Sequence, residues 1–337
     1  MTPLLLAAML AAAPAELVPP SPPPAAASGA SGSIDPAAAT RAYLDELPPD
    51  QRARSDAYFE GGYWLHLWTF LWAAAIFVVL LHTGLSAKMR DLAVRATRIR
   101  ALQTALYWTQ FVIAVAVLSF PLSVYSDFVR EHRYGLSNLS FAAWMGEELK
   151  GLAISIVLGG FAMMALYAIV RRLPRTWWIW GAAVTIAFAA FGALIAPVLI
   201  VPLFNNPKKL QDARVVAPIL SMARANGIHT GEVWEIDASK QSKRVSANVS
   251  GLFGTERITL NDNLLNRCSP GEVMAVMGHE MGHYVLNHLY KDILFNGLVI
   301  VIMFALLKWA ISRALFDVSA QRLWPWFVQF IPVAGAE

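Results

Sequence analysis

Five long apolar segments constrain the fold of this chain more than any other feature of its sequence. A transmembrane helix needs about 20 consecutive apolar residues, and each segment is long enough to cross a bilayer. One such run could be a buried helix of a soluble protein, but five in one chain favour a mainly α-helical membrane protein. The segments cover roughly residues 64–85, 104–126, 151–170, 176–204 and 293–316.

The composition agrees with this interpretation. The chain is 57% hydrophobic and only 15% charged, whereas soluble domains are about 45–50% apolar and about 25% charged. The net charge of +4 comes without a dense basic block, so we expect the lipid bilayer, and no nucleic acid, as a partner. Cys268 is the single cysteine, which excludes an intrachain disulfide and a cysteine-cluster zinc site.

The chain divides into regions of different composition. Residues 1–16 form a candidate signal peptide, because a short apolar run precedes small residues suited to cleavage. Residues 17–34 are rich in proline and alanine and resemble a linker. An N-terminal region of about four transmembrane helices follows at 35–204, and an incomplete C-terminal transmembrane region occupies 293–337.

The region between these membrane segments, 205–292, is more polar. Strand-like runs at 231–237, 244–251 and 255–260 alternate with turn signals. We therefore expect an α/β domain that faces water and is inserted between membrane spans.

One helix of this region carries a recognisable motif. Ser269 followed by Pro270 and Glu272 predicts a capped helix start. Further along the same helix, His279, Glu280 and His283 form the pattern H-E-x-x-H.

The motif suits zinc-dependent hydrolysis. Residues four apart lie on one helix face, so His279 and His283 can bind one zinc ion. Glu280 is then the candidate general base for an attacking water. The alternative is two solvated histidines on an exposed helix.

A catalytic zinc needs a third protein ligand. His288 does not fit the metzincin spacing, because that motif needs Gly at 286 and His at 289, and both positions are leucine. A downstream acidic ligand, as in the His₂Glu sites of thermolysin-like enzymes, is the natural alternative.

The chain resembles the M48 peptidases, and among them the Ste24-type membrane zinc endopeptidases, also called CAAX prenyl protease 1. The likeness includes GHEMGHYVLNH and three further segments at 131–151, 196–210 and 233–265. It implies a multi-span helical barrel that encloses a chamber, with an inserted gluzincin-like α/β zinc-metallopeptidase domain. It also implies hydrolysis of peptide bonds in membrane-associated polypeptides, so a peptide or membrane-protein substrate is expected.

The resemblance implies roles for individual residues. His279 and His283 would be zinc ligands and Glu280 the catalytic base. The strand that contains Ala247, Asn248 and Val249 would bind substrate along its edge. Ser246 stands where the family usually has asparagine, which puts that side chain's role in doubt. The alternative for this stretch is an ordinary edge strand.

The third zinc ligand is unknown. The family supplies a glutamate from an E-x-x-x-D helix after its last spans, and no such pattern is present here. After His283 the acidic residues are Asp292, Asp317 and Glu337. Asp292 is expected to lie too far along the motif helix. We therefore expect a chain truncated before the ligand helix, with weak zinc binding and poor cleavage.

Two questions stay open at this stage. Basic residues in the loops at 86–103 and 171–175 place those loops in the cytoplasm by the positive-inside rule, and the zinc domain outside it. Eukaryotic relatives present that domain to the cytosol instead.

We expect a multi-pass protein of the bacterial inner membrane. The competing functions are a non-catalytic binding or scaffold homologue and a heat-shock protease of the HtpX type, against which the segments at 131–151 and 196–210 argue.

Overall fold

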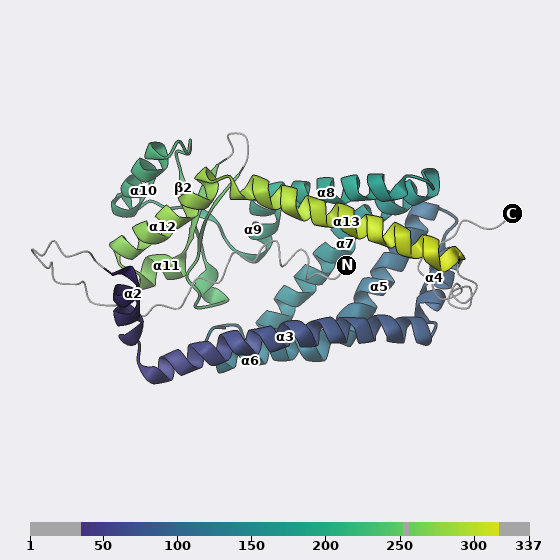
Figure 1. Ribbon diagram of the computed structural model, residues 1–337, viewed down its shortest axis with the longest axis horizontal. Helices are drawn as coiled ribbons and strands as arrows, with labels where there is room; N and C mark the ends of the chain where they lie inside the picture. Colours follow the sequence, from purple (N-terminus) through teal and green to yellow (C-terminus); the bar gives the residue numbers. More distant parts are fainter. Residues whose placement is uncertain (1–34, 252–255, 317–337) are drawn as a thin grey trace, which may run out of the picture.

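The computed structural model of the protein describes residues 35–251 and 256–316. Long helices form most of it, and a small α/β domain lies at one end of the helical part (Figure 1). The candidate signal peptide, the linker and the part of the C-terminal transmembrane region after residue 316 lie outside the described residues.

Among the described residues, five helices are long and apolar enough to cross a membrane, as the five apolar segments predict. α3 (Pro49–His82), α7 (Phe141–Arg172) and α13 (His288–Phe316) are continuous. The other two contain wide π-helical turns: α5 (Arg100–Ser123) continues through η1 (Val124–Val129) into α6 (Arg130–Arg133), and α8 (Trp177–Ile195) continues through η2 (Ala196–Ile200) into α9 (Val201–Phe204).

The two wide turns have a local cause. Pro121 lies just before η1, and Pro197 lies within η2. Proline has no backbone N–H, so it cannot make the hydrogen bond that continues an α-helical ladder. The chain widens at these points without leaving the helical path.

α3, α8 and α13 lie roughly along the long axis of the molecule (Figure 1). α3 runs along one side, α8 and α13 run side by side along the other, and α5 and α7 cross between them. The short helix α4 (Leu85–Ala96) crosses the end that is remote from the α/β domain. Both basic loops therefore lie at that remote end.

Glycines allow close helix contacts in the membrane part. A Cβ atom placed on Gly159 of α7 would lie 2.5 Å from the indole of Trp108 on α5. The same indole donates a hydrogen bond from Nε1 to the carbonyl of Ser155 at 3.0 Å. Small residues permit such approach where helices cannot rely on the hydrophobic effect.

The α/β domain contains a four-stranded sheet in the order β1-β2-β4-β3. β1 (Lys208–Lys209) is antiparallel to β2 (Val233–Ile236), β2 is parallel to β4 (Arg257–Asn261), and β3 (Ala247–Ser250) is antiparallel to β4. The three strands predicted from the sequence are confirmed: β2 and β3 are shorter than predicted, and β4 starts later and ends one residue later than predicted. β1 was not predicted.

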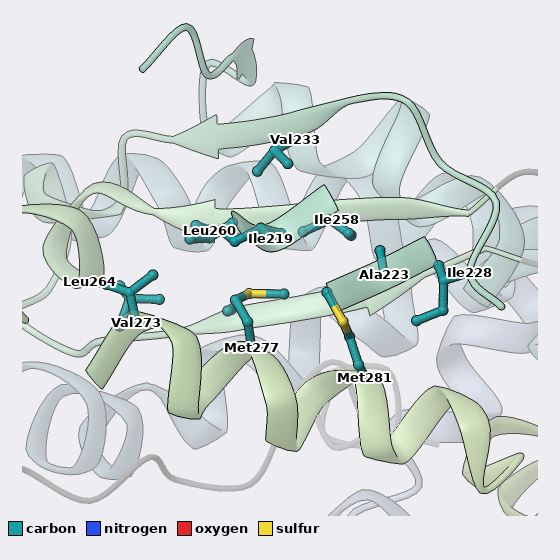
Figure 2. Packing of buried hydrophobic residues seen from close by; sticks show 11 residues of the cluster. Ile219, Ala223, Ile228, Val233, Ile258, Leu260, Leu264, Val273, Met277 and Met281 are labelled. Carbon is teal, nitrogen blue, oxygen red and sulfur yellow. The ribbon is translucent and has the colours of Figure 1, made fainter. Parts of the chain in front are cut away.

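Helices complete the domain, and three of them contribute side chains to its buried core. The helices are α10 (Ala213–Ala225), the single turn η3 (Ala238–Lys240), α11 (Asp262–Arg267) and α12 (Pro270–Val285), while α2 (Pro36–Asp45) precedes the first span. Val273, Met277 and Met281 of α12 are buried against sheet residues such as Ile258 and Leu260 (Figure 2). Burial of one such side chain contributes about 1.5–3 kcal/mol, which fixes the face that α12 turns to the sheet.

A short backbone pairing joins the domain to the membrane part. Ser137, between α6 and α7, forms an antiparallel bridge with Ser242. The N–H of Asn138 donates to the carbonyl of Gln241 at 2.9 Å, and the N–H of Lys243 donates to the carbonyl of Leu136 at 2.9 Å. The segment that leads into β3 is therefore held by the loop between two membrane helices.

Candidate active site

The helix that carries the H-E-x-x-H motif begins as the sequence predicts. The Ser269 hydroxyl accepts a hydrogen bond from the N–H of Glu272, and the Glu272 carboxylate accepts one from the N–H of Ser269 at 2.6 Å. This capping box satisfies backbone donors that the first helical turn leaves without partners. Pro270 occupies the first turn, where its missing N–H has no cost.

His279 and His283 meet on the face of α12 that points away from the core. Their Nε2 atoms lie 3.0 Å apart, and both side chains are exposed. Two nitrogens bound tetrahedrally to zinc at about 2.05 Å would lie about 3.3 Å apart. The two imidazoles therefore fit a shared zinc ion with a shift of only a few tenths of an ångström.

Glu280 follows the first histidine on the same helix and is partly buried. Burial raises the pKa of its carboxyl, and the neighbouring His279 and His283 act in the opposite direction. Partial desolvation strengthens a carboxylate as a proton acceptor, which suits the role of general base.

The end of α12 differs from the expectation. The helix stops at Val285, Asn287 adopts a left-handed conformation with φ of 56°, and α13 starts at His288. Asp292 therefore belongs to the next helix, and the assumption that it continues the motif helix was wrong. Asn tolerates this conformation better than other non-glycine residues because its side chain bonds locally.

The helix break brings His288 back to the motif. Its Nδ1 lies 2.8 Å from Nδ1 of His283, and its side chain is partly buried. The metzincin spacing assigns no role to this residue. Asn287, a helix-stopping residue directly before it, is the signal that could have indicated the turn.

The third metal ligand stays unassigned. Within residues 35–251 and 256–316, no three His, Cys, Asp or Glu side chains are placed to bind one metal ion. Asp317 and Glu337 lie outside the described residues.

β3, the predicted substrate strand, forms one edge of the sheet and packs beside α12. The N–H of Asn261 donates to the carbonyl of Ser246 at 2.9 Å. Hydrogen-bonded pairs alternate along an antiparallel ladder, so Asn248 is paired with Thr259 through its backbone. The backbone groups of Ala247 and Val249 then point away from β4, toward the open edge.

Two hydrogen bonds hold the residue that leads into this strand. The carbonyl of Arg244 accepts from the side-chain amides of Asn261 at 2.7 Å and Asn263 at 3.0 Å. Both asparagines are buried. The residues before β3 are therefore hydrogen-bonded both to the α/β domain and to the loop between α6 and α7.

A further hydrogen bond fixes the last turn of α12. The Tyr284 hydroxyl donates to the Glu256 carboxylate at 2.7 Å, close to the start of β4. Burial and the hydrogen bond to Glu256 raise the pKa of Tyr284 to about 12. The last turn of α12, which carries His283, is thus tied to the residue directly before β4.

Comparison with known proteins places these features in a family. Residues 37–206 match the CAAX prenyl protease N-terminal region with five membrane helices, and residues 209–336 match peptidase family M48. The chain is similar to the crystal structure of S. mikatae Ste24p, with a TM-score of 0.70 and 26% identity, over 78% of this chain and 64% of that one. This match confirms the predicted fold class, a multi-span helical barrel that encloses a chamber and carries an inserted α/β peptidase domain.

Curated relatives give the same result. The chain is 30% identical to CAAX prenyl protease 1 of Saccharomyces cerevisiae over 234 residues, which are 68% of this chain and 51% of the relative. It is 29% identical to the uncharacterized metalloprotease YhfN of Bacillus subtilis over 215 residues, 64% of this chain and 50% of the relative. The chain thus spans about half the length of these relatives. The chain belongs to peptidase family M48 and, within it, to the membrane-spanning Ste24 type.

Proposed function

We propose that the protein is a zinc-dependent endopeptidase that hydrolyses peptide bonds of membrane-associated polypeptides. The observation that carries the proposal is the convergence of His279 and His283 at Nε2, next to Glu280, on a helix that packs against the edge strand β3. The family match favours this function over a non-catalytic scaffold.

His279 and His283 would hold the zinc through Nε2, and a third ligand remains to be identified. Bound zinc lowers the pKa of a water molecule to about 7 and polarises a carbonyl oxygen. Both imidazoles must be neutral at Nε2 to serve as ligands.

Glu280 performs the proton transfers. Its carboxylate takes a proton from the attacking water as the new C–O bond forms at the scissile carbonyl carbon. The same carboxyl then gives that proton to the leaving amine nitrogen as the C–N bond breaks. The reaction needs no covalent bond between protein and substrate.

β3 would orient the substrate. An extended peptide can pair with a free strand edge through its backbone, so that binding does not depend on one particular side chain. The N–H and carbonyl groups of Ala247 and Val249 are the ones that the ladder leaves available on this edge. Asn248 would contribute its exposed side chain.

The position of the domain at one end of the membrane helices supports this substrate class (Figure 1). Polypeptides that enter or leave the bilayer pass this end, and we place the protein in a bacterial inner membrane. The Saccharomyces cerevisiae relative is named CAAX prenyl protease 1, but a prenylated substrate is not required for the chemistry proposed here.

Metal removal and restoration tests the proposal. The protein in phospholipid nanodiscs is treated with a chelator, dialysed, and assayed with a fluorescence-quenched peptide before and after zinc is returned. We expect cleavage to disappear and then recover with zinc. Cleavage that persists without metal, or that zinc fails to restore while the protein stays folded, would contradict the proposed function.

A further inference from the structure

We propose that His288 is a positioning residue that holds His283 in the tautomer and orientation needed to bind metal. The proposal rests on the proposed function, because it concerns the same site. It assigns a role to a residue outside the H-E-x-x-H motif and does not make that residue a metal ligand.

The two ring nitrogens of His283 have different partners. Nε2 lies 3.0 Å from Nε2 of His279, while Nδ1 lies 2.8 Å from Nδ1 of His288. The two ring nitrogens of an imidazole point in divergent directions. A metal held between the Nε2 atoms is therefore on the far side of the His283 ring from His288, and His288 cannot bind it.

The hydrogen bond restricts the protonation of both rings. A ligand nitrogen carries no proton, so neutral His283 must carry its proton on Nδ1. That N–H donates to Nδ1 of His288, which must in turn be the acceptor and carry its own proton on Nε2. Partners of this kind fix the tautomer and ring direction of metal-binding histidines.

The helix break makes this contact available. In a continuous α-helix, His288 would lie about 140° around the axis and about 7.5 Å along it from His283. Instead, the N–H of Asn287 donates to the carbonyl of Tyr284, and the N–H of Lys291 donates to the carbonyl of Asn287, which starts the next helix. The left-handed Asn287 changes the chain direction between the two helices.

The ring contacts repeat along the three histidines. The rings of His279 and His283 meet edge to face with centroids 4.7 Å apart, and those of His283 and His288 do the same at 4.8 Å. His283 is the middle ring, and both of its neighbours contact it through ring nitrogens. Its orientation is therefore set from both sides before any metal binds.

Zinc affinity is the measurement that tests this role. The variant His288→Phe keeps a planar ring but removes the acceptor, and we expect a 10- to 100-fold loss of zinc affinity with an unchanged final stoichiometry. His288→Asp restores an acceptor and should bind within a few-fold of the wild type. His229→Phe is the matched control, because it makes the same change at an exposed histidine of the α/β domain outside the motif, and its affinity should not change.

A spectroscopic readout separates positioning from general damage. In protein with ¹⁵N-labelled histidine, metal-free His283 should populate one tautomer, and His288→Phe should convert it into a mixture. Asn287→Val, which disfavours the left-handed conformation, should reproduce the effect, while Asn287→Gly should not.

The possible results are distinguishable. If the wild type binds no zinc at His279 and His283, the proposed function fails. If it binds zinc and folded His288→Phe binds equally well with His283 still in one tautomer, the function stands and the role of His288 is refuted. If His288→Phe does not fold, normal binding by His288→Asp together with weakened binding by Asn287→Val supports the role, and normal binding by Asn287→Val refutes it.

Discussion

The guanidinium of Arg244 donates a hydrogen bond to the Glu131 carboxylate at 2.8 Å, although the two residues are 113 positions apart. The Tyr58 hydroxyl donates to the same carboxylate at 2.8 Å. Arg130 also stacks on the Tyr58 ring, 3.9 Å from its centroid. This cluster connects α3 and α6 of the membrane part with the segment that enters β3.

Removing the charge of Arg244 should weaken this connection. We expect Arg244→Met to lower the unfolding temperature by several degrees, since hydrogen bonds to charged groups contribute about 1.5–3 kcal/mol and half-exposed pairs contribute less. Because β3 would also shift, the KM for peptides should rise more than kcat falls. Thermal unfolding in detergent and steady-state kinetics measure the two effects.

Arg214→Met is the matched control for this change. Arg214 pairs with Asp212 at 2.9 Å, but its side chain is 89% exposed and lies far from β3 in the chain. Its removal should leave both quantities unchanged. Equal effects of the two substitutions would show that the cluster has no particular role.

Backbone pairing along β3 can be tested with proline. Val249→Pro removes an N–H that points to the open edge, so we expect higher KM with a normal unfolding temperature. Asn248→Pro removes an N–H of the ladder with β4 and should destabilise the sheet itself. Unchanged peptide kinetics in folded Val249→Pro would exclude this strand as the binding edge.

The close contact between α5 and α7 predicts a steric effect. Gly159→Ala places a methyl group against Trp108 and should destabilise the membrane part by about 1–3 kcal/mol. Gly151→Ala in the same helix has no atom within 4 Å of the added methyl, and it should be neutral or slightly stabilising. Comparing the thermal unfolding of both variants checks the packing directly, and similar values would contradict it.

Many features of the fold could be predicted from local sequence patterns. The spans follow from hydropathy, the start of α12 from Ser269 and Glu272, and the strands from alternating residues bounded by turns. The three motif residues follow from helical spacing alone. Each of these features depends on residues within a few positions of one another, so a single sequence is enough to predict it.

Other features depend on contacts that one sequence does not record. The pairing of Arg244 with Glu131 joins residues far apart in the chain, and no local pattern indicates it. The turn at Asn287 depends on one left-handed residue, whose effect on His288 is visible only in three dimensions. The two-residue strand β1 is too short for a period-2 pattern to be recognised.

The distribution of basic residues predicts one of the two possible orientations in the membrane, and no finding yet tests it. The basic residues of the α4 region and of the loop between α7 and α8 lie at the end remote from the peptidase domain. The positive-inside rule predicts that this end is cytoplasmic and that the domain is outside. A periplasm-specific reporter fused near Ala225 should be active, and activity of a cytoplasm-specific reporter at the same site would reverse the orientation.

Catalysis by Glu280 is the central claim, and Glu280→Gln tests it most directly. The amide keeps the size of the side chain but cannot accept the proton of the attacking water. We predict that zinc content stays at the wild-type level while peptide cleavage in nanodiscs falls at least about 100-fold, in line with typical general-base contributions. A folded, zinc-containing Glu280→Gln protein that cleaves peptides at the wild-type rate would contradict the account.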